Sequence, residues 1–171
     1  MPNSAPYWSE LQARLDALPS SQWRALLDRL RQAIGPDTER PYRFGASHGD
    51  WSPWNTTESD GRILAWDWEK FEDGVPVGLD AVHFDIQNAV VFGGGSPADG
   101  FADALRRAPQ IVNADDDRQA RATVLIYALH IGLRYVEDSE VDAGEGKMSR
   151  LGTWLPGLVQ AAETGSWQRT G

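Results

Sequence analysis

One long apolar stretch, residues 118–136, limits the folds that this chain can adopt more than any other part of the sequence. Apolar side chains occupy most sides of the helix that this stretch would form. Such a helix is stable only where other elements cover it, so we expect it to be central and buried. His130 and Gly132 interrupt its most apolar part, and no apolar run in the chain reaches the length of a membrane span.

Shorter helices should surround this central one. Apolar residues recur every three or four positions in several segments, which predicts helices at 7–34 with a break at Pro19, 79–92, 97–107 and 148–163. Between residues 56 and 68, two short strand-like runs flank the turn signal Ser59-Asp60-Gly61, which predicts one small hairpin. Residues 137–146 are acidic and contain glycine, and we expect a solvated loop there. The fold class is therefore mainly α with a small β-hairpin, in a single domain over residues 1–171.

Composition excludes several classes of function. The 171 residues include no cysteine, which removes disulfide scaffolds, thiolate metal sites and cysteine nucleophiles. The formal net charge of −9 argues against a nucleic-acid binder, because such a protein needs positive charge for the phosphates. Nothing at the N-terminus resembles a secretory signal, so a cytoplasmic location with no membrane partner is expected. There is no Gly-x-Ser-x-Gly nucleophile elbow and no histidine pair for zinc, and Gly93-Gly94-Gly95 reads as a helix-ending loop.

Three oxygen-bearing side chains carry the chemical information. Asp50 and Asn55 stand at the two ends of one loop, and the hairpin that follows returns the chain with Asp67 at its end. Two carboxylates and an amide oxygen suit Mg²⁺, which shares its coordination shell with water and phosphate oxygens. A carboxylate that is not bound to the ion can accept a proton from a hydroxyl group. This is the minimum equipment for phosphoryl transfer from a nucleotide. The pair Asp67 and Glu69 leaves open a metal-dependent phosphohydrolase.

The same residues resemble a known family. His48-Gly49-Asp50 with Asn55 five residues after Asp50, followed by Asp67-Trp68-Glu69, is similar to the catalytic core of the aminoglycoside phosphotransferase and choline kinase-like enzymes, which are relatives of the protein kinases. The resemblance implies that Asp50 is the catalytic base, that Asn55 and Asp67 are magnesium ligands, and that His48 supports the catalytic loop. Trp68 stands where the protein kinases place Phe.

The resemblance also implies a supporting aspartate downstream that hydrogen-bonds the catalytic loop. Asp80 best matches this position, and Asp85 is the alternative. His83 is expected either to hydrogen-bond the catalytic loop or to pack between helices. His130, inside the apolar stretch, is expected to be a satisfied core residue. The acidic run 115–117 is expected to cap the long helix.

The resemblance covers only the C-terminal lobe of the kinase-like fold, over residues 7–163. The 47 residues before His48 contain no lysine and no Gly-rich loop, and they predict two helices, so the N-terminal nucleotide lobe is absent from the sequence. Within the single domain we distinguish N-terminal helices at 7–35, a catalytic loop and metal-binding hairpin at 45–70, and a helical substrate-side part at 79–164. A face left without its lobe would expose apolar residues, which predicts a partner protein or a homo-oligomer.

Two functions follow as hypotheses. The first is an enzyme: a phosphotransferase that uses Mg²⁺ with ATP or GTP and transfers the γ-phosphate to a hydroxyl of a small molecule or peptide, with a missing or partner-supplied nucleotide lobe. The second is a non-catalytic, kinase-derived binding module, that is, a truncated pseudokinase. The sequence does not name the acceptor or any substrate-binding residue.

Overall fold

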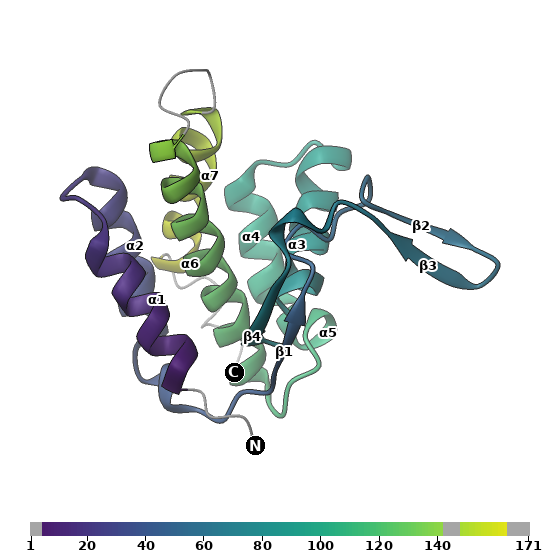
Figure 1. Cartoon of the computed structure of the whole chain (residues 1–171), viewed down its shortest axis with the longest axis horizontal. Helices are drawn as coiled ribbons and strands as arrows, with labels where there is room; N and C mark the ends of the chain where they lie inside the picture. Colours follow the sequence, from purple (N-terminus) through teal and green to yellow (C-terminus); the bar gives the residue numbers. More distant parts are fainter. Residues whose placement is uncertain (1–4, 142–147, 164–171) are drawn as a thin grey trace.

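A helical body with two small antiparallel sheets forms the part of the chain that the computed structural model describes, residues 5–141 and 148–163 (Figure 1). Within these residues seven segments are α-helical, namely α1 (Ala5–Ala17), α2 (Gln22–Ile34), α3 (Leu79–Gln87), α4 (Pro97–Arg106), α5 (Ala108–Ile111), α6 (Asp117–Val141) and α7 (Met148–Glu163). Short single-turn elements are η1 (Gly35–Glu39), η2 (Trp68–Lys70) and the π-helical η3 (Asn88–Phe92). The mainly helical fold class is confirmed. None of the described helices has the length and apolarity needed to cross a membrane.

The long helix α6 lies at the centre of the body, as its sequence predicts. Helices α2 and α7 pack against it, α4 packs against α7, and α3 and α5 contact α6 from the other side (Figure 1). Its apolar side chains form much of the core, including Val124, Leu125, Ile126, Leu129, Ile131 and Leu133, each no more than 2% exposed. Because α6 is covered on several sides, burial of its side chains is the main stabilising contribution to the position of this helix.

Caps and breaks in the sequence set the ends of the helices. The Ser21 side chain accepts a hydrogen bond from the Arg24 backbone N–H and starts α2 after the break at Pro19. Gly35 ends α2 with a positive φ of 53°. The Asp116 carboxylate accepts from the Gln119 backbone N–H at 2.7 Å at the start of α6, so one member of the acidic run 115–117 is a capping residue.

Two sheets are present where the sequence predicts a single hairpin. Strands β2 (Thr56–Ser59) and β3 (Arg62–Ala65) form the expected hairpin, which projects from the helical body (Figure 1). Asp60 and Gly61 at its tip both have positive φ, which is the backbone of a two-residue turn that matches the twist of a hairpin. The second sheet joins β1 (Phe44–Ser47) to β4 (Glu72–Pro76). Its strands carry no clear apolar alternation, and their pairing is non-local, so local patterns do not reveal it.

Two expected boundaries are also wrong. Helix α6 continues to Val141, beyond the predicted loop start at residue 137, because Tyr135 and Val136 still pack into the core and extend the helix. Residues 142–147 of the predicted loop lie outside the described residues, as do residues 1–4 and 164–171 of the expected domain. The predicted helix 79–92 ends as regular α-helix at Gln87 and continues as the π-helical η3.

Candidate functional site

The β1–β4 pair closes the base of the loop that carries the sequence motif. The chain leaves β1 at Ser47, passes through residues 48–55, forms the β2–β3 hairpin, and returns through η2 to β4 beside β1. The pairing shifts register between Gly45 and Ser47, immediately before the loop. As a result, the two ends of this excursion are fixed at neighbouring points, and residues near 48 lie against residues near 68.

Gly49 shows how tightly these two segments approach each other. Its φ is +80°, and a Cβ at this position would lie 2.0 Å from the backbone oxygen of Lys70. Only glycine fits this position, because any side chain would clash with backbone and not with a movable side chain. The Arg134 side chain on α6 donates a hydrogen bond to the Gly49 carbonyl at 2.7 Å, which ties the loop to the central helix.

Asp80 accepts three hydrogen bonds from the start of the loop. Its Oδ1 accepts from the Ser47 hydroxyl at 2.8 Å and the Gly49 backbone N–H at 3.0 Å, and its Oδ2 accepts from the His48 backbone N–H at 2.7 Å. The alternative residue, Asp85, lies elsewhere on α3 and forms a bidentate ion pair with Arg107. Of the two aspartates that the sequence proposes, Asp80 is therefore the one placed to support the loop.

His48 joins the loop to the end of the hairpin. Its Nε2 lies 2.9 Å from the Trp66 carbonyl oxygen, and its Nδ1 lies 3.3 Å from the Asp50 backbone nitrogen. Because a carbonyl only accepts, the proton belongs on Nε2, and Nδ1 then accepts from the Asp50 N–H. The ring is 2% exposed and packs against Trp68, with the two ring centres 4.5 Å apart.

Asp50 and Asn55 are in direct contact. The Asn55 side-chain nitrogen donates to Oδ2 of Asp50 at 2.9 Å and also to the Asp50 backbone carbonyl at 3.1 Å. The other oxygen of the Asp50 carboxylate, Oδ1, lies 3.0 Å from Nε2 of His83. With its nitrogen on Asp50, the Asn55 amide has its oxygen as the atom that can ligate a cation.

Asp67 follows Trp66, whose backbone is hydrogen-bonded to both ends of the loop. Trp66 donates its backbone N–H to the Asn55 carbonyl at 3.2 Å, and its own carbonyl is bound by His48. Asp67 itself has a φ of 64°, and Asp60 is the only other described non-glycine residue with positive φ. Asp60 belongs to the hairpin turn, whereas Asp67 follows a strand. A left-handed backbone outside a hairpin turn is of the kind that concentrates at functional sites.

The side chains of Asp50, Asn55 and Asp67 suit a hard divalent cation only if ligands from outside the protein complete its coordination. Among the residues that the structure describes, no group of three or more His, Cys, Asp or Glu side chains could hold a metal ion. Asp50, Asn55 and Asp67 contribute two carboxylates and one amide, which is fewer than a closed protein site requires. Mg²⁺ commonly binds through one or two carboxylates together with water and phosphate oxygens. The residues therefore suit an ion that arrives with a phosphate ligand.

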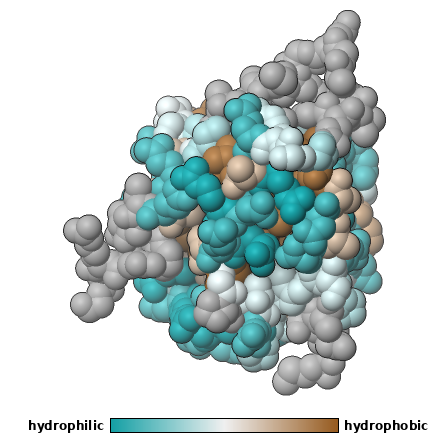
Figure 2. All heavy atoms as spheres, turned by 90° about the vertical axis from the view of Figure 1, so that its left-hand side faces the viewer, coloured by the Kyte–Doolittle hydropathy of each residue, from teal (hydrophilic) through white to brown (hydrophobic). Residues whose placement is uncertain are grey.

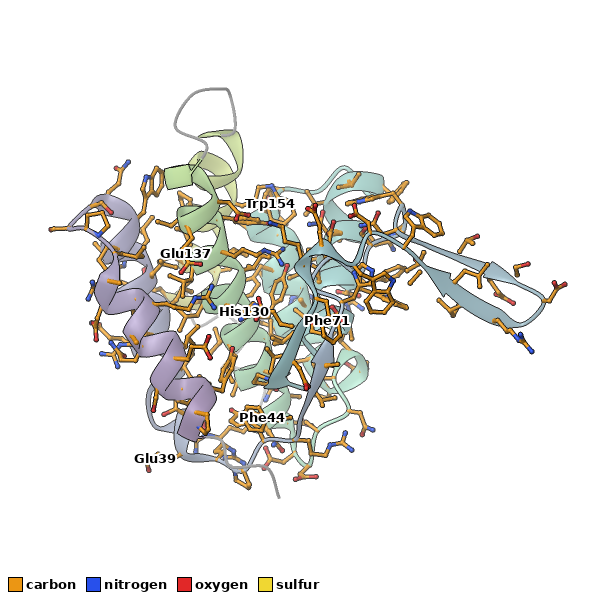
Figure 3. All side chains as sticks on the ribbon, viewed as in Figure 1. Glu39, Phe44, Phe71, His130, Glu137 and Trp154 are labelled. Atoms are coloured by element: carbon orange, nitrogen blue, oxygen red, sulfur yellow. The ribbon has the colours of Figure 1, made fainter. Side chains whose placement is uncertain are left out.

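The remaining histidine, His130, belongs to a different cluster. It is buried on the side of α6 that faces α1, where it contacts the Tyr7 hydroxyl at 3.4 Å and the Glu72 carboxylate at 3.5 Å (Figure 3). The hydrogen bond from His130 holds the pKa of Glu72 below its ordinary value. Burial, aided by the charge of Glu72, raises the pKa of Tyr7. His130 is thus a core residue with polar partners, as its position in the apolar stretch predicts.

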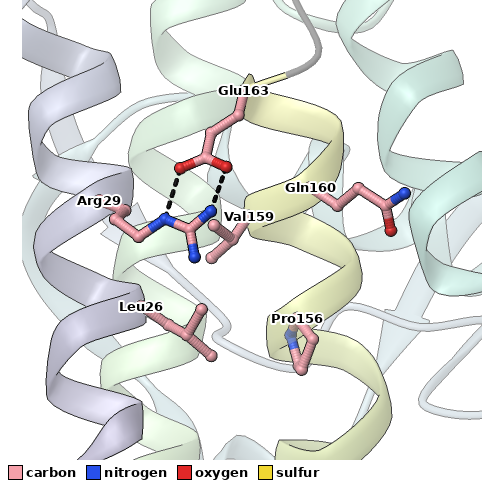
Figure 4. Close-up of a pocket in the computed structure, with 6 residues that line it drawn as sticks. All are labelled: Leu26, Arg29, Pro156, Val159, Gln160 and Glu163. Carbon is pink, nitrogen blue, oxygen red and sulfur yellow. Dashed lines mark hydrogen bonds and ion pairs between the residues drawn. The ribbon is translucent and has the colours of Figure 1, made fainter.

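The pocket between α2 and α7 contains none of the predicted site residues. It is lined by Leu26, Arg29, Pro156, Val159, Gln160 and Glu163 (Figure 4). Arg29 and Glu163 form a bidentate ion pair across it, in which hydrogen bonding to Arg29 lowers the pKa of Glu163. We interpret this pocket as a packing contact between two helices.

The exposed large apolar side chains that the structure describes all come from residues 54–92. We call this set the hairpin face, and it consists of Trp54, Ile63, Leu64, Trp66, Trp68, Phe71, Val77, Val91 and Phe92. Ile63 and Leu64, adjacent on β3 and so on opposite faces of the hairpin, are 59% and 50% exposed. By contrast, the side of the molecule formed by α1 and α2 is largely hydrophilic (Figure 2). No local pattern marks these side chains as exposed, whereas a hydrogen bond from His83 to the loop was one of the two expectations for that residue, and its contact with Asp50 agrees with it.

In comparisons with known proteins, no family model matches the chain, and no curated protein and no solved structure matches it.

Proposed function

We propose that this chain is the catalytic lobe of a Mg²⁺-dependent phosphotransferase, which transfers the γ-phosphate of ATP or GTP to a hydroxyl of a small molecule or peptide. The observation that carries the proposal is the hydrogen-bonded pair of Asp50 and Asn55, on a loop whose two ends are bonded to the backbone of Trp66, the neighbour of Asp67. Asp50 and Asn55 touch, and Asp67 follows the residue that binds Asn55 and His48. On this proposal the chain has the C-terminal lobe of the kinase-like fold, and the nucleotide lobe comes from elsewhere.

The chemistry assigns one role to each side chain. Asp50 accepts the proton of the acceptor hydroxyl as its oxygen attacks the γ-phosphorus and the bond to the leaving nucleoside diphosphate breaks. Asn55 and Asp67 are the residues that would hold Mg²⁺, and that ion, when bound, neutralises charge on the phosphate oxygens. Asp80 and His48 keep the loop and the hairpin end in register, so that base and ligands keep their separation.

The hairpin face is where the rest of the nucleotide site would join. An isolated two-stranded hairpin is marginal in water, and this one has two open edges and apolar residues on both sides. Residues 54–77 include six acidic and two basic side chains, a net charge of −4. A second copy would bring the same negative charge, so we propose as occupant a separate basic polypeptide, which could also supply a lysine for the phosphates.

Manganese and ATP provide a direct test of the ion site. Mn²⁺ replaces Mg²⁺ and broadens the NMR signals of nearby groups, so the Asn55 side-chain amide is the reporter. We expect Mn²⁺ with ATP to broaden this signal in the wild type and in Asp60→Asn, but at least about tenfold less effectively in Asp67→Asn. Asp60→Asn is the matched control, because both aspartates have positive φ and both variants lose one charge. Equal broadening in both variants, or none in the wild type, contradicts the proposal.

Association experiments address the partner. Sedimentation of the chain alone, and with a basic binding partner recovered from its host, distinguishes a monomer that binds a partner from a homo-oligomer. A Leu64→Lys variant should weaken the complex without lowering stability, since Leu64 is half exposed. If the chain instead forms a homo-oligomer that the same variant disrupts, then the occupant of the hairpin face is a second copy of the chain and not a basic partner.

The exposed hairpin face also favours a second function, a non-catalytic binding module. In that case partner binding remains sensitive to Leu64→Lys, whereas Mn²⁺ with ATP leaves the Asn55 signal unchanged. The two measurements therefore separate the enzyme from the module.

A further inference from the structure

We infer that His83 is a positioning residue for Asp50, with Tyr127 setting the orientation of the His83 ring. This inference rests on the proposed function, in which Asp50 is the base. It adds a chain of three side chains, of which Tyr127 and His83 are buried, running from the central helix α6 through α3 to the loop, which fixes the carboxylate that accepts the proton.

The atoms that are in contact determine the tautomer. Nε2 of His83 lies 3.0 Å from Oδ1 of Asp50, and Nδ1 lies 3.1 Å from the Tyr127 hydroxyl. An ionised carboxylate only accepts hydrogen bonds, so the proton of the neutral ring is on Nε2. Nδ1 is then an acceptor, and the Tyr127 hydroxyl donates to it. Each contact thus supports the other, because the Tyr127 bond favours the tautomer that Asp50 requires.

Both supporting residues are held in rigid surroundings. His83 and Tyr127 are each 3% exposed, and their rings pack edge to face with centres 5.9 Å apart. They lie on α3 and α6, whose neighbouring side chains belong to the core. Asp50, by contrast, lies on a loop. A loop carboxylate that is hydrogen-bonded to a helix side chain takes its position from the more rigid element.

The carboxylate is held at both oxygens. His83 binds Oδ1 and Asn55 binds Oδ2, so rotation of the carboxylate would break one hydrogen bond or the other. If His83 is removed, Oδ1 loses this constraint, while the proposed ligands Asn55 and Asp67 remain. We therefore expect loss of His83 to slow turnover and to leave binding of Mg²⁺ with nucleotide unchanged. A displacement of about 1 Å at a reacting group is sufficient for a rate loss of the order of a hundredfold.

Two substitutions of His83 each preserve one of its two hydrogen-bonding positions and remove the other. In His83→Gln the amide nitrogen reaches the position of Nε2 and can still donate to Asp50. In His83→Asn the shorter amide reaches only the position of Nδ1, near Tyr127. In the complex with the polypeptide that supplies the nucleotide lobe, we expect His83→Gln to retain turnover within about threefold and His83→Asn to lose about tenfold or more. A purely structural histidine would tolerate both equally. The same pair of changes at His130, which is also buried, measures the general effect of replacing a core histidine.

A spectroscopic measurement tests the contact without any assay of activity. The chain contains three histidines, so ¹⁵N labelling of histidine and comparison with His83→Gln assign the His83 ring. We expect a proton on Nε2, the nitrogen that lies against Asp50. Asp50→Ala should shift both ring nitrogens of His83, whereas Asp67→Asn should leave them in place.

The outcomes separate this inference from the proposed function. A ring without a proton on Nε2, or a ring that does not respond to Asp50→Ala, overturns the contact even if the enzyme is active. The expected tautomer with equal turnover of the Gln and Asn variants overturns the positioning role. If Mn²⁺ with ATP fails to broaden the Asn55 signal, the assigned base falls with the function, and the ring spectra still decide whether His83 holds Asp50.

Discussion

Replacing Asp80 with asparagine should destabilise the protein far more than the same replacement five residues further along α3. The Asp80 carboxylate accepts from the Ser47 hydroxyl and from the backbone N–H groups of His48 and Gly49. Asparagine has the same shape but only one oxygen. With that oxygen in the place of Oδ1, it keeps the Ser47 and Gly49 bonds and turns its NH₂ group toward the His48 N–H.

The magnitude follows from what is lost and what is left unpaired. A hydrogen bond to a charged group contributes about 1.5–3 kcal/mol, and a buried donor without a partner costs about 1–3 kcal/mol. His48 is 2% exposed, so water cannot readily replace the lost acceptor. We expect the free energy of unfolding to fall by about 3–4 kcal/mol. At about 2–4 °C per kcal/mol for a domain of this size, the melting temperature should drop by roughly 6–16 °C.

Asp85→Asn is the matched control for this experiment. Asp85 lies on the same helix and pairs with Arg107, whose side chain is 43% exposed. A partly exposed ion pair contributes about 1 kcal/mol or less, so this variant should melt within about 4 °C of the wild type. Chemical and thermal unfolding of both variants give the comparison. Equal losses in the two variants would refute the assignment of Asp80 as the support of the loop.

Two further predictions concern the loop and the His130 cluster. Gly49→Ala places a Cβ 2.0 Å from the Lys70 backbone oxygen, so the free energy of unfolding of this variant should fall by about 3 kcal/mol or more. Gly61 has a similar φ but open space around it, so Gly61→Ala should lose only about 1 kcal/mol. Denaturant unfolding measures both losses, and equal losses would count against the close approach of Gly49 to Lys70. His130 lowers the pKa of Glu72, so the stability that this carboxylate contributes is present above its ordinary pKa of 4.5 and is lost as the pH falls through the lower folded value. Unfolding free energies from about pH 7 to 3 should therefore decline more steeply for the wild type than for Glu72→Gln, by up to about 1 kcal/mol, and parallel curves would contradict this linkage.

Local signals in the sequence predict most of the helices and the tip of the hairpin. Ser21 caps α2 by accepting a hydrogen bond from the backbone N–H of Arg24, three residues later, and Gly35 ends the same helix. Both signals therefore act over a few residues. The Asp60-Gly61 turn likewise depends only on the backbone freedom of adjacent residues. Such features can be read without knowledge of the rest of the chain, because the interacting groups are near one another in the sequence.

The assembly of the site is not local in this sense. The β1–β4 pair joins segments separated by the whole motif, and its residues show no apolar alternation that would mark them as strands. The choice of Asp80 over Asp85 depends on where α3 lies relative to Ser47. The contact of His83 with Asp50, and that of Arg134 with the Gly49 carbonyl, depend on the packing of α3 and α6.

The sequence by itself therefore determined a buried central helix, its surrounding helices, one hairpin, and a motif of Asp50, Asn55 and Asp67 with the oxygen atoms that magnesium and phosphate chemistry need. Only the tertiary structure decided which aspartate supports the loop, which histidine holds the candidate base, and that large apolar side chains between residues 54 and 92 are exposed. The physical reason is that side-chain type and periodicity are local properties, whereas hydrogen bonds between distant segments exist only once packing has brought those segments together.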